Sequence, residues 1–137
     1  MSPAPMPVIA ALYAGLVGLL LFVLAARISG LRGKLEVWIG DGGDRELQRA
    51  IRAHGNAVEW AVPAIVLLLI ANLTRAPDLF LHLCGVAIVI GRLLHAIGLS
   101  RAGGYSFERL FGSVLSWGAV LVLAVWNVWA FARLLLV

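Results

Sequence analysis

Four long apolar segments alternate with shorter polar segments along this chain. The apolar segments span residues 8–26, 57–73, 79–99 and 110–136. Each is close to the roughly 20 residues that an α-helix needs to cross a bilayer core. Lipid favours helices, because a helix pairs its backbone polar groups internally. The pattern predicts an all-α membrane protein, a bundle of four transmembrane helices, formed by one domain over residues 1–137.

The first apolar segment has to be distinguished from a cleavable signal peptide. A signal peptide begins with a positively charged region, whereas the residues before Val8, "MSPAPMP", include no Lys or Arg. The apolar run from Val8 to Ala26 is also longer than the roughly 7–15 residues of an ordinary signal-peptide core. We therefore expect this segment to be a retained transmembrane helix.

Basic residues are concentrated in two of the three connections. The opposite side carries only Arg75 and Arg133. By the positive-inside rule the two basic connections are cytoplasmic, and both termini lie on the non-cytoplasmic side. The basic residues of these two connections are Arg27, Arg32, Lys34, Arg45, Arg49, Arg52, Arg101 and Arg109.

Composition supports the membrane interpretation and argues against other classes of protein. Hydrophobic residues make up 62% of the chain and charged residues 13%, whereas a soluble domain is about half apolar and about a quarter charged. The net charge of +4 therefore reflects topology, and no nucleic-acid partner is expected. Cys84 is the only cysteine, which excludes an intrachain disulfide and a cysteine-based metal site. We expect no bound metal.

A polar stripe leads into the second apolar segment. Asp41, Gly42 and Gly43 are typical of a turn, and Asp44 is a candidate N-cap, so the helix is predicted to begin about a dozen residues before its apolar part. Pro63 cannot donate a hydrogen bond to the carbonyl four residues earlier, which predicts a loosened turn there. The polar residues of this helix, spaced to share one face, are Arg45, Arg49, Arg52, Asn56 and Glu59.

The third and fourth segments carry polar residues toward the same end. "GRLLH" places Arg92 and His95 three residues apart, and Arg109, Ser113 and Ser116 can share a face of the fourth helix. A charge at the centre of a transmembrane helix costs about 2.5–3.5 kcal/mol, so such groups usually pair or line a cavity. The sequence therefore predicts a polar cluster at the cytoplasmic end of the bundle.

Structural interpretations of these residues remain open at this point. The arginines of the stripe can act as interfacial anchors. Glu59 can form an ion pair with Arg52 or with Arg92, and Asn56 can form an interhelical hydrogen bond. The two serines of the fourth helix are expected to be close-packing residues.

The stretch "ELQRAIRAHGNAVE" resembles the signature of the MAPEG family, the membrane-associated proteins of eicosanoid and glutathione metabolism. The core of that signature, Arg-Ala-x-x-Asn-x-x-Glu, is matched here by Arg52, Ala53, Asn56 and Glu59. "GRLLH" resembles the family's third-helix segment, and the four spans match as well. The chain is most similar to small bacterial inner-membrane members of the family, which have no well-assigned reaction.

The resemblance implies a homotrimer that binds glutathione between neighbouring subunits near the cytoplasmic face. It implies that Arg52 holds a carboxylate of glutathione, that Asn56 hydrogen-bonds its backbone, and that Glu59 receives its amino group or orients Arg52. Two further ligand contacts are implied for Arg32 and His95. The resemblance assigns the catalytic role to Arg109, whose guanidinium would favour the thiolate form of glutathione.

The chain also departs from the pattern of the glutathione-using members. Gly55 stands where some of them have a further arginine, and Leu99 stands where many have tyrosine. Leu110 follows Arg109 where one branch has a catalytic serine, and Trp60 replaces a tyrosine that often follows the glutamate. These departures remove hydrogen-bond donors and a cation that the ligand would use, so they weaken the activity assignment more than the fold assignment.

The sequence therefore supports two candidate functions. The first is a glutathione-dependent transferase or peroxidase of the bacterial inner membrane that acts on hydrophobic electrophiles or lipid hydroperoxides, with glutathione as co-substrate. The second is a noncatalytic protein that binds a lipid or another hydrophobic small molecule in the same intersubunit cleft, like the family's lipoxygenase-activating protein. A purely structural bundle explains the four spans but not the polar stripe.

Overall fold

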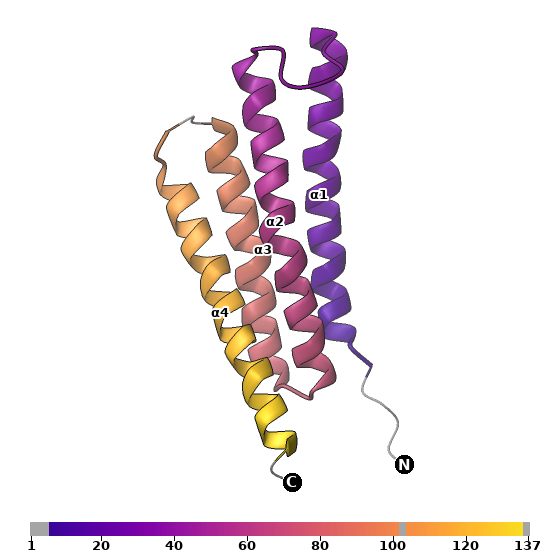
Figure 1. Ribbon diagram of the computed structural model, residues 1–137, viewed down its shortest axis with the longest axis vertical. Coiled ribbons are helices and arrows are strands. Elements are labelled where there is room, and N and C mark those ends of the chain that lie inside the picture. The colour runs from indigo at the N-terminus through magenta and orange to yellow at the C-terminus, as the bar shows by residue number, and fades with distance from the viewer. Residues whose placement is uncertain (1–5, 102–103, 136–137) are drawn as a thin grey trace.

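The computed structural model of the protein describes residues 6–101 and 104–135 as a bundle of four helices (Figure 1). All four helices are long and apolar enough to cross a membrane. The all-α four-helix prediction is thus confirmed, and residue 136, the predicted end of the fourth span, lies outside the described residues. The helices are α1 (Val8–Leu35), α2 (Arg45–Leu73), α3 (Asp78–Arg101) and α4 (Phe107–Leu135).

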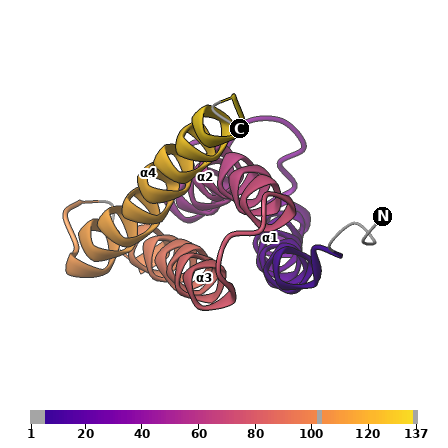
Figure 2. The ribbon, with the colours of Figure 1, turned by 90° about the horizontal axis from the view of Figure 1, so that it is seen from below.

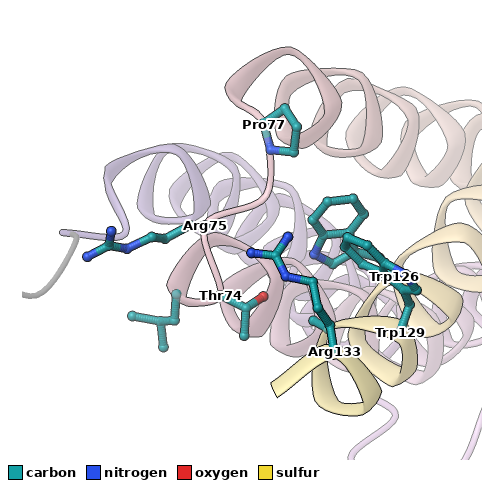
Figure 3. A pocket seen from close by; sticks show the side chains of 8 residues that line it. Thr74, Arg75, Pro77, Trp126, Trp129 and Arg133 are labelled. Atoms are coloured by element: carbon teal, nitrogen blue, oxygen red, sulfur yellow. The ribbon is translucent and has the colours of Figure 1, made fainter. Parts of the chain in front are cut away.

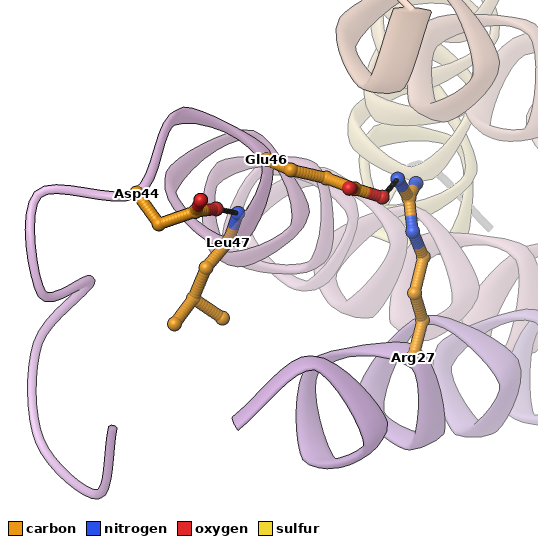
Figure 4. A network of polar contacts seen from close by, with 4 residues as sticks. All are labelled: Arg27, Asp44, Glu46 and Leu47. Carbon is orange, nitrogen blue, oxygen red and sulfur yellow. Dashed lines mark hydrogen bonds and ion pairs between the residues drawn. The ribbon is translucent and has the colours of Figure 1, made fainter. Parts of the chain in front are cut away.

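The connection between α1 and α2 ends one helix and starts the next with local hydrogen bonds. Helix α1 stops at Glu36, which adopts the left-handed conformation (φ 55°) and donates its backbone N–H to the Arg32 carbonyl. Asp44 caps α2, because its Oδ1 accepts a hydrogen bond from the Leu47 backbone N–H at 2.8 Å (Figure 4). The predicted early start of the second helix is confirmed.

Helix α2 is one of two central elements of the bundle, because α3 also packs against every other helix. Helix α2 packs against α1, α3 and α4, whereas α1 and α4 do not contact each other within the described residues (Figure 2). The face that α2 turns inward is mostly alanine, beside Leu47, Leu68 and Asn72, and the small alanine side chains allow its neighbours to approach closely. The buried alanines of this face are Ala50, Ala53, Ala57, Ala61, Ala64 and Ala71.

The two ends of the bundle hold different segments of the chain (Figure 1). The loop end holds the α1–α2 and α3–α4 connections. The terminal end holds the short α2–α3 turn together with Met6 and Leu135. The larger apolar core includes Tyr13, Leu68 and Leu81, whereas a smaller one is formed by Leu24, Ala57 and Ala96.

Candidate functional site

The centre of the candidate site is a buried arginine on α3. Arg92 is only 1% exposed and lies nine residues before the end of α3, about 14 Å from that end at 1.5 Å per residue. Its Nη1 donates to Asn56 Oδ1 of α2 at 3.1 Å. Its Nη2 donates to the Gly112 carbonyl of α4 at 3.3 Å and to the Ser116 hydroxyl. The guanidinium thus links three helices through neutral acceptors.

One nitrogen of this guanidinium has no hydrogen-bond partner among the described residues. This nitrogen is the Nε atom of Arg92, which is buried. Ser116 does not compensate the positive charge, because its hydroxyl is neutral; it also donates to the Gly112 carbonyl at 2.8 Å. Buried charges are normally paired with an opposite charge, so the protein encloses a cation that its own bonded neighbours leave uncompensated.

Two glycines bring α3 and α4 together at the level of this arginine. A Cβ added at Gly91 would lie 2.8 Å from the Gly112 carbonyl oxygen, and one added at Gly112 would lie 2.5 Å from the Gly91 carbonyl oxygen. Both positions therefore require glycine, because the opposing atoms belong to the backbone. This contact holds Arg92 and Ser116 close enough for their hydrogen bond.

A cavity of about 310 Å³ lies between α3 and α4 toward the loop end. His95 and Arg109 line it with Ser113, and Leu110 and Trp117 add apolar surface. A buried histidine and a half-buried arginine on two helices thus face one compartment. The cavity offers cationic and hydrogen-bonding groups beside apolar walls, which suits a ligand that has both polar and apolar parts.

Local contacts position Arg109 and this cavity. Ser106 caps α4, since its hydroxyl accepts from the Arg109 backbone N–H at 3.3 Å, and the Arg109 guanidinium donates to the Gly104 carbonyl. Trp117 packs against Trp60 of α2 with ring centroids 5.2 Å apart. The cavity is thereby connected to the segment of α2 that carries Glu59.

The outer face of α2 carries exposed charges, with Arg52 and Glu59 following Arg45 at intervals of seven residues. Glu59 lies fourteen residues before the end of α2 at Leu73, about 21 Å along the helix. A bilayer core is about 30 Å thick, so this carboxylate is placed within the membrane-spanning part of the helix. Charged side chains at such depth usually face a protein interior or a water-filled cavity. The outer face of α2 is therefore a surface that needs a cover.

The structure brings some of the predicted site residues together and places others apart. Asn56 is bonded to Arg92, and His95 and Arg109 share the cavity. Arg32 instead helps to close the α1–α2 connection, because its guanidinium donates to the Val37 carbonyl at 3.1 Å. The interhelical hydrogen bond considered for Asn56 is present.

The ion pairs considered for Glu59 are not formed within the described residues. The one ion pair there joins Arg27 and Glu46 at 3.2 Å, near the loop end and largely in solvent (Figure 4). Glu59 is exposed, and the bonds of the Arg92 guanidinium go to neutral groups instead. Arg52 and Glu59 thus have no ion-pair partner among the described residues.

Sequence reasoning gave too little weight to Arg92 and Ser116. The interpretation of Ser116 as a close-packing residue is confirmed by its contact with Gly91 but incomplete, since its hydroxyl also accepts from the Arg92 guanidinium. A signal was present: Arg92 follows a glycine in the middle of an apolar segment and lies three residues before His95. A charge in that position is costly enough to mark a site without any motif.

Comparison with known proteins agrees with this architecture. The fold and the buried polar cluster define a small membrane protein of four helices. The sequence profile of the MAPEG family matches residues 10–129, and the chain belongs to this family. It is 40% identical to the inner membrane protein YecN of Escherichia coli strain K12 over 126 residues. This aligned stretch covers 88% of this chain and 91% of the relative. The same figures hold for YecN of strain CFT073.

Proposed function

We propose that the protein binds glutathione in the bacterial inner membrane and uses its thiol against hydrophobic electrophiles or lipid hydroperoxides. Membership in a family with many glutathione-using members supports the choice of ligand, and similarity to the inner membrane protein YecN supports the location. The observation that carries the proposal is the exposure of Glu59 at membrane depth, with the exposed Arg52 seven residues nearer the loop end on the same helix face. Charges of both signs on one helix face match a ligand that carries carboxylates and an ammonium.

The proposed site lies where a second copy of the chain covers the outer face of α2, in a homotrimer. In this arrangement Arg52 binds a carboxylate of glutathione and Glu59 its ammonium. Asn56 contributes its amide nitrogen, because Arg92 occupies only its Oδ1 atom. His95 and Arg32 are further proposed contacts, and Arg32 would have to exchange its bond to the Val37 carbonyl for the ligand.

Arg109 is the proposed catalytic residue. Its guanidinium lines the cavity, where a nearby positive charge favours the thiolate over the thiol and so supplies a nucleophile at neutral pH. In the transferase reaction the thiolate sulfur attacks the electrophilic carbon and the leaving group departs. In the peroxidase reaction two glutathione molecules are oxidised to the disulfide while the hydroperoxide is reduced to an alcohol and water.

A noncatalytic ligand-binding protein is the second candidate function. Leu110 lines the same cavity as Arg109, so an apolar side chain occupies the position that a catalytic serine takes in one branch of the family. A cavity with one arginine and several apolar walls also suits a lipid that is only held. The two candidates differ in whether the bound thiol ionises.

The experiment is a titration of the detergent-purified protein with glutathione, followed by calorimetry and by thiolate ultraviolet absorbance at neutral pH. Saturable binding with a thiolate signal is the expected result. Arg109→Leu should keep the calorimetric binding and lose the thiolate signal, whereas Glu59→Gln should weaken binding and leave the assembly unchanged in size-exclusion chromatography. Binding without thiolate would favour the second candidate. Absence of glutathione binding would overturn both the transferase and the peroxidase proposal.

A further inference from the structure

A second cavity lies at the terminal end, on the side of the molecule where α4 meets the α2–α3 turn. It has a volume of about 440 Å³ and is lined by Thr74, Arg75, Trp126, Trp129 and Arg133, among others (Figure 3). All of its lining residues are apolar, neutral or basic. The cavity is therefore suited to a ligand with an anionic group.

The hydrogen-bond donors of this cavity have no anionic acceptor among its lining residues. The Arg133 guanidinium lies over the ring of Trp129, 5.4 Å from its centroid, and in Figure 3 it reaches back over the cavity toward the α2–α3 turn. The indole Nε1 of Trp126 is buried and has no hydrogen-bond partner among the described residues. An orphaned buried donor is destabilising, and an anionic oxygen in the cavity would satisfy it.

The far side of the α2–α3 turn, which carries Arg75, faces a different cavity. Figure 3 shows the Arg75 side chain pointing away from Trp126 and Arg133. Arg75 also borders a separate cavity, which it shares with Asp78 and His82. Arg133 is thus the guanidinium that serves the tryptophan cavity, and Arg75 adds positive charge at its rim.

An apolar groove of about 250 Å³ continues from this cavity along α3 and α4. Trp126 and Trp129 line both compartments, and Phe80, Val122 and Val125 form the rest of the groove. Val122 precedes Arg133 by eleven residues, which is about 16 Å along a helix. A cationic pocket beside tryptophans, followed by an apolar channel that leads toward the middle of the span, matches the profile of a membrane interface.

We propose that this cavity and groove bind one anionic phospholipid. The headgroup phosphate accepts hydrogen bonds from the Arg133 guanidinium and the Trp126 indole N–H, and one acyl chain lies along Phe80, Val122 and Val125. A lipid fits better than a soluble anion, because the groove provides no polar group for a ligand without a chain. This site lies at the opposite end of the bundle from the glutathione site and does not depend on the proposed function.

The test is native mass spectrometry of the whole protein released from micelles that contain equal amounts of phosphatidylglycerol and phosphatidylcholine. The unmodified protein should retain phosphatidylglycerol preferentially. In Arg133→Gln the preference should fall about fivefold, as expected for one basic residue near a membrane surface. The matched control is Arg45→Gln, which removes an equally exposed arginine at the loop end and should leave the preference unchanged. Equal loss in both variants, or no loss in either, would overturn the proposal.

Two further arms separate a lipid from a free anion and from a protein partner. Val125→Trp fills the groove and should reduce retention of both lipids while keeping the preference for phosphatidylglycerol. Inorganic phosphate at millimolar concentration should not displace the lipid. Displacement by phosphate with no effect of Val125→Trp would show an anion site instead of a lipid site. A lipid preference that is absent in the assembled oligomer and appears only in the separated protomer would show that a second copy covers this face.

Discussion

The two ends of the bundle bury polar side chains for different purposes. Toward the loop end, the charged guanidinium of Arg92 is enclosed by Asn56 and Ser116 from two other helices. At the terminal end the polar groups engaged inside the bundle include two neutral amides, Asn72 and Asn127. The first arrangement adds a charge to the membrane interior, whereas the second adds none.

The amides of the terminal end bond to the backbone of neighbouring helices. Asn72 accepts from the Ala10 N–H at 3.1 Å, which is one of the first N–H groups of α1 and has no partner inside its own helix. Asn127 donates to the Leu67 carbonyl at 3.0 Å. In lipid the pairing of the free Ala10 N–H is a structural need, whereas the Leu67 carbonyl lies inside α2 and gains an additional bond. No comparable backbone need accounts for the charge of Arg92, which the proposed ligand site would explain.

The largest effect is expected where α3 and α4 touch beside Arg92. Gly112→Ala should lower the free energy of unfolding by about 3 kcal/mol, because overpacking forces rigid backbone atoms apart. The new Cβ would lie 2.5 Å from the Gly91 carbonyl oxygen and 2.6 Å from the His95 backbone nitrogen. The measurement is unfolding by SDS titration in mixed micelles, followed by tryptophan fluorescence.

The matched control for this change lies on the same helix. A Cβ at Gly118 would meet no atom within 4 Å, so Gly118→Ala should raise stability by up to roughly 1 kcal/mol through helix propensity. If both substitutions behaved alike, the glycine contact would not hold the loop end together, and the position of Arg92 would need another explanation.

The second effect concerns the buried charge itself. Asn56→Leu should cost about 2 kcal/mol, because it removes a neutral acceptor from a charged donor that stays buried. Arg92→Met removes the charge and keeps much of the length, so it should be neutral or stabilising. In the Arg92→Met background, Asn56→Leu should cost much less than it does alone. The same SDS titration of both single variants and the double variant measures this coupling.

The outcome also separates structure from function at Arg92. Arg92→Met is expected to weaken glutathione binding in calorimetry while the fold persists. A loss of stability equal to that of Asn56→Leu would instead make the guanidinium a structural link between α2, α3 and α4. In that case the buried charge of Arg92 would still distinguish the loop end from the terminal end, but it would not indicate a ligand site.

The sequence predicted the four helices better than their ends. Apolar runs report where lipid surrounds the chain, so the first span was placed at residues 8–26, whereas α1 continues to Leu35. The start of α2 was predicted correctly because the cap at Asp44 is a local signal that depends on side-chain chemistry.

The arrangement of the site was harder to predict, because it depends on which helices are neighbours. The polar stripe of α2 was expected to act as one face, yet the structure turns Asn56 toward Arg92 and leaves Arg52 and Glu59 exposed. Spacing alone could not divide the stripe. The division follows from the inward alanines of α2 and from the contact of Gly91 with Gly112, which are properties of the packed bundle.

The smallest effect is expected at the terminal end, where the same kind of substitution removes a neutral bond. Asn72→Leu leaves the Ala10 N–H without its acceptor and should cost about 1 kcal/mol, the usual net value of an uncharged hydrogen bond. The first turn of α1 can also fray toward the headgroups, which limits the loss further. SDS titration beside Asn56→Leu compares the two ends directly, and amide hydrogen exchange at Ala10 locates the change. A cost at Asn72 equal to or above that at Asn56 would mean that burial depth, and not charge, distinguishes the two ends.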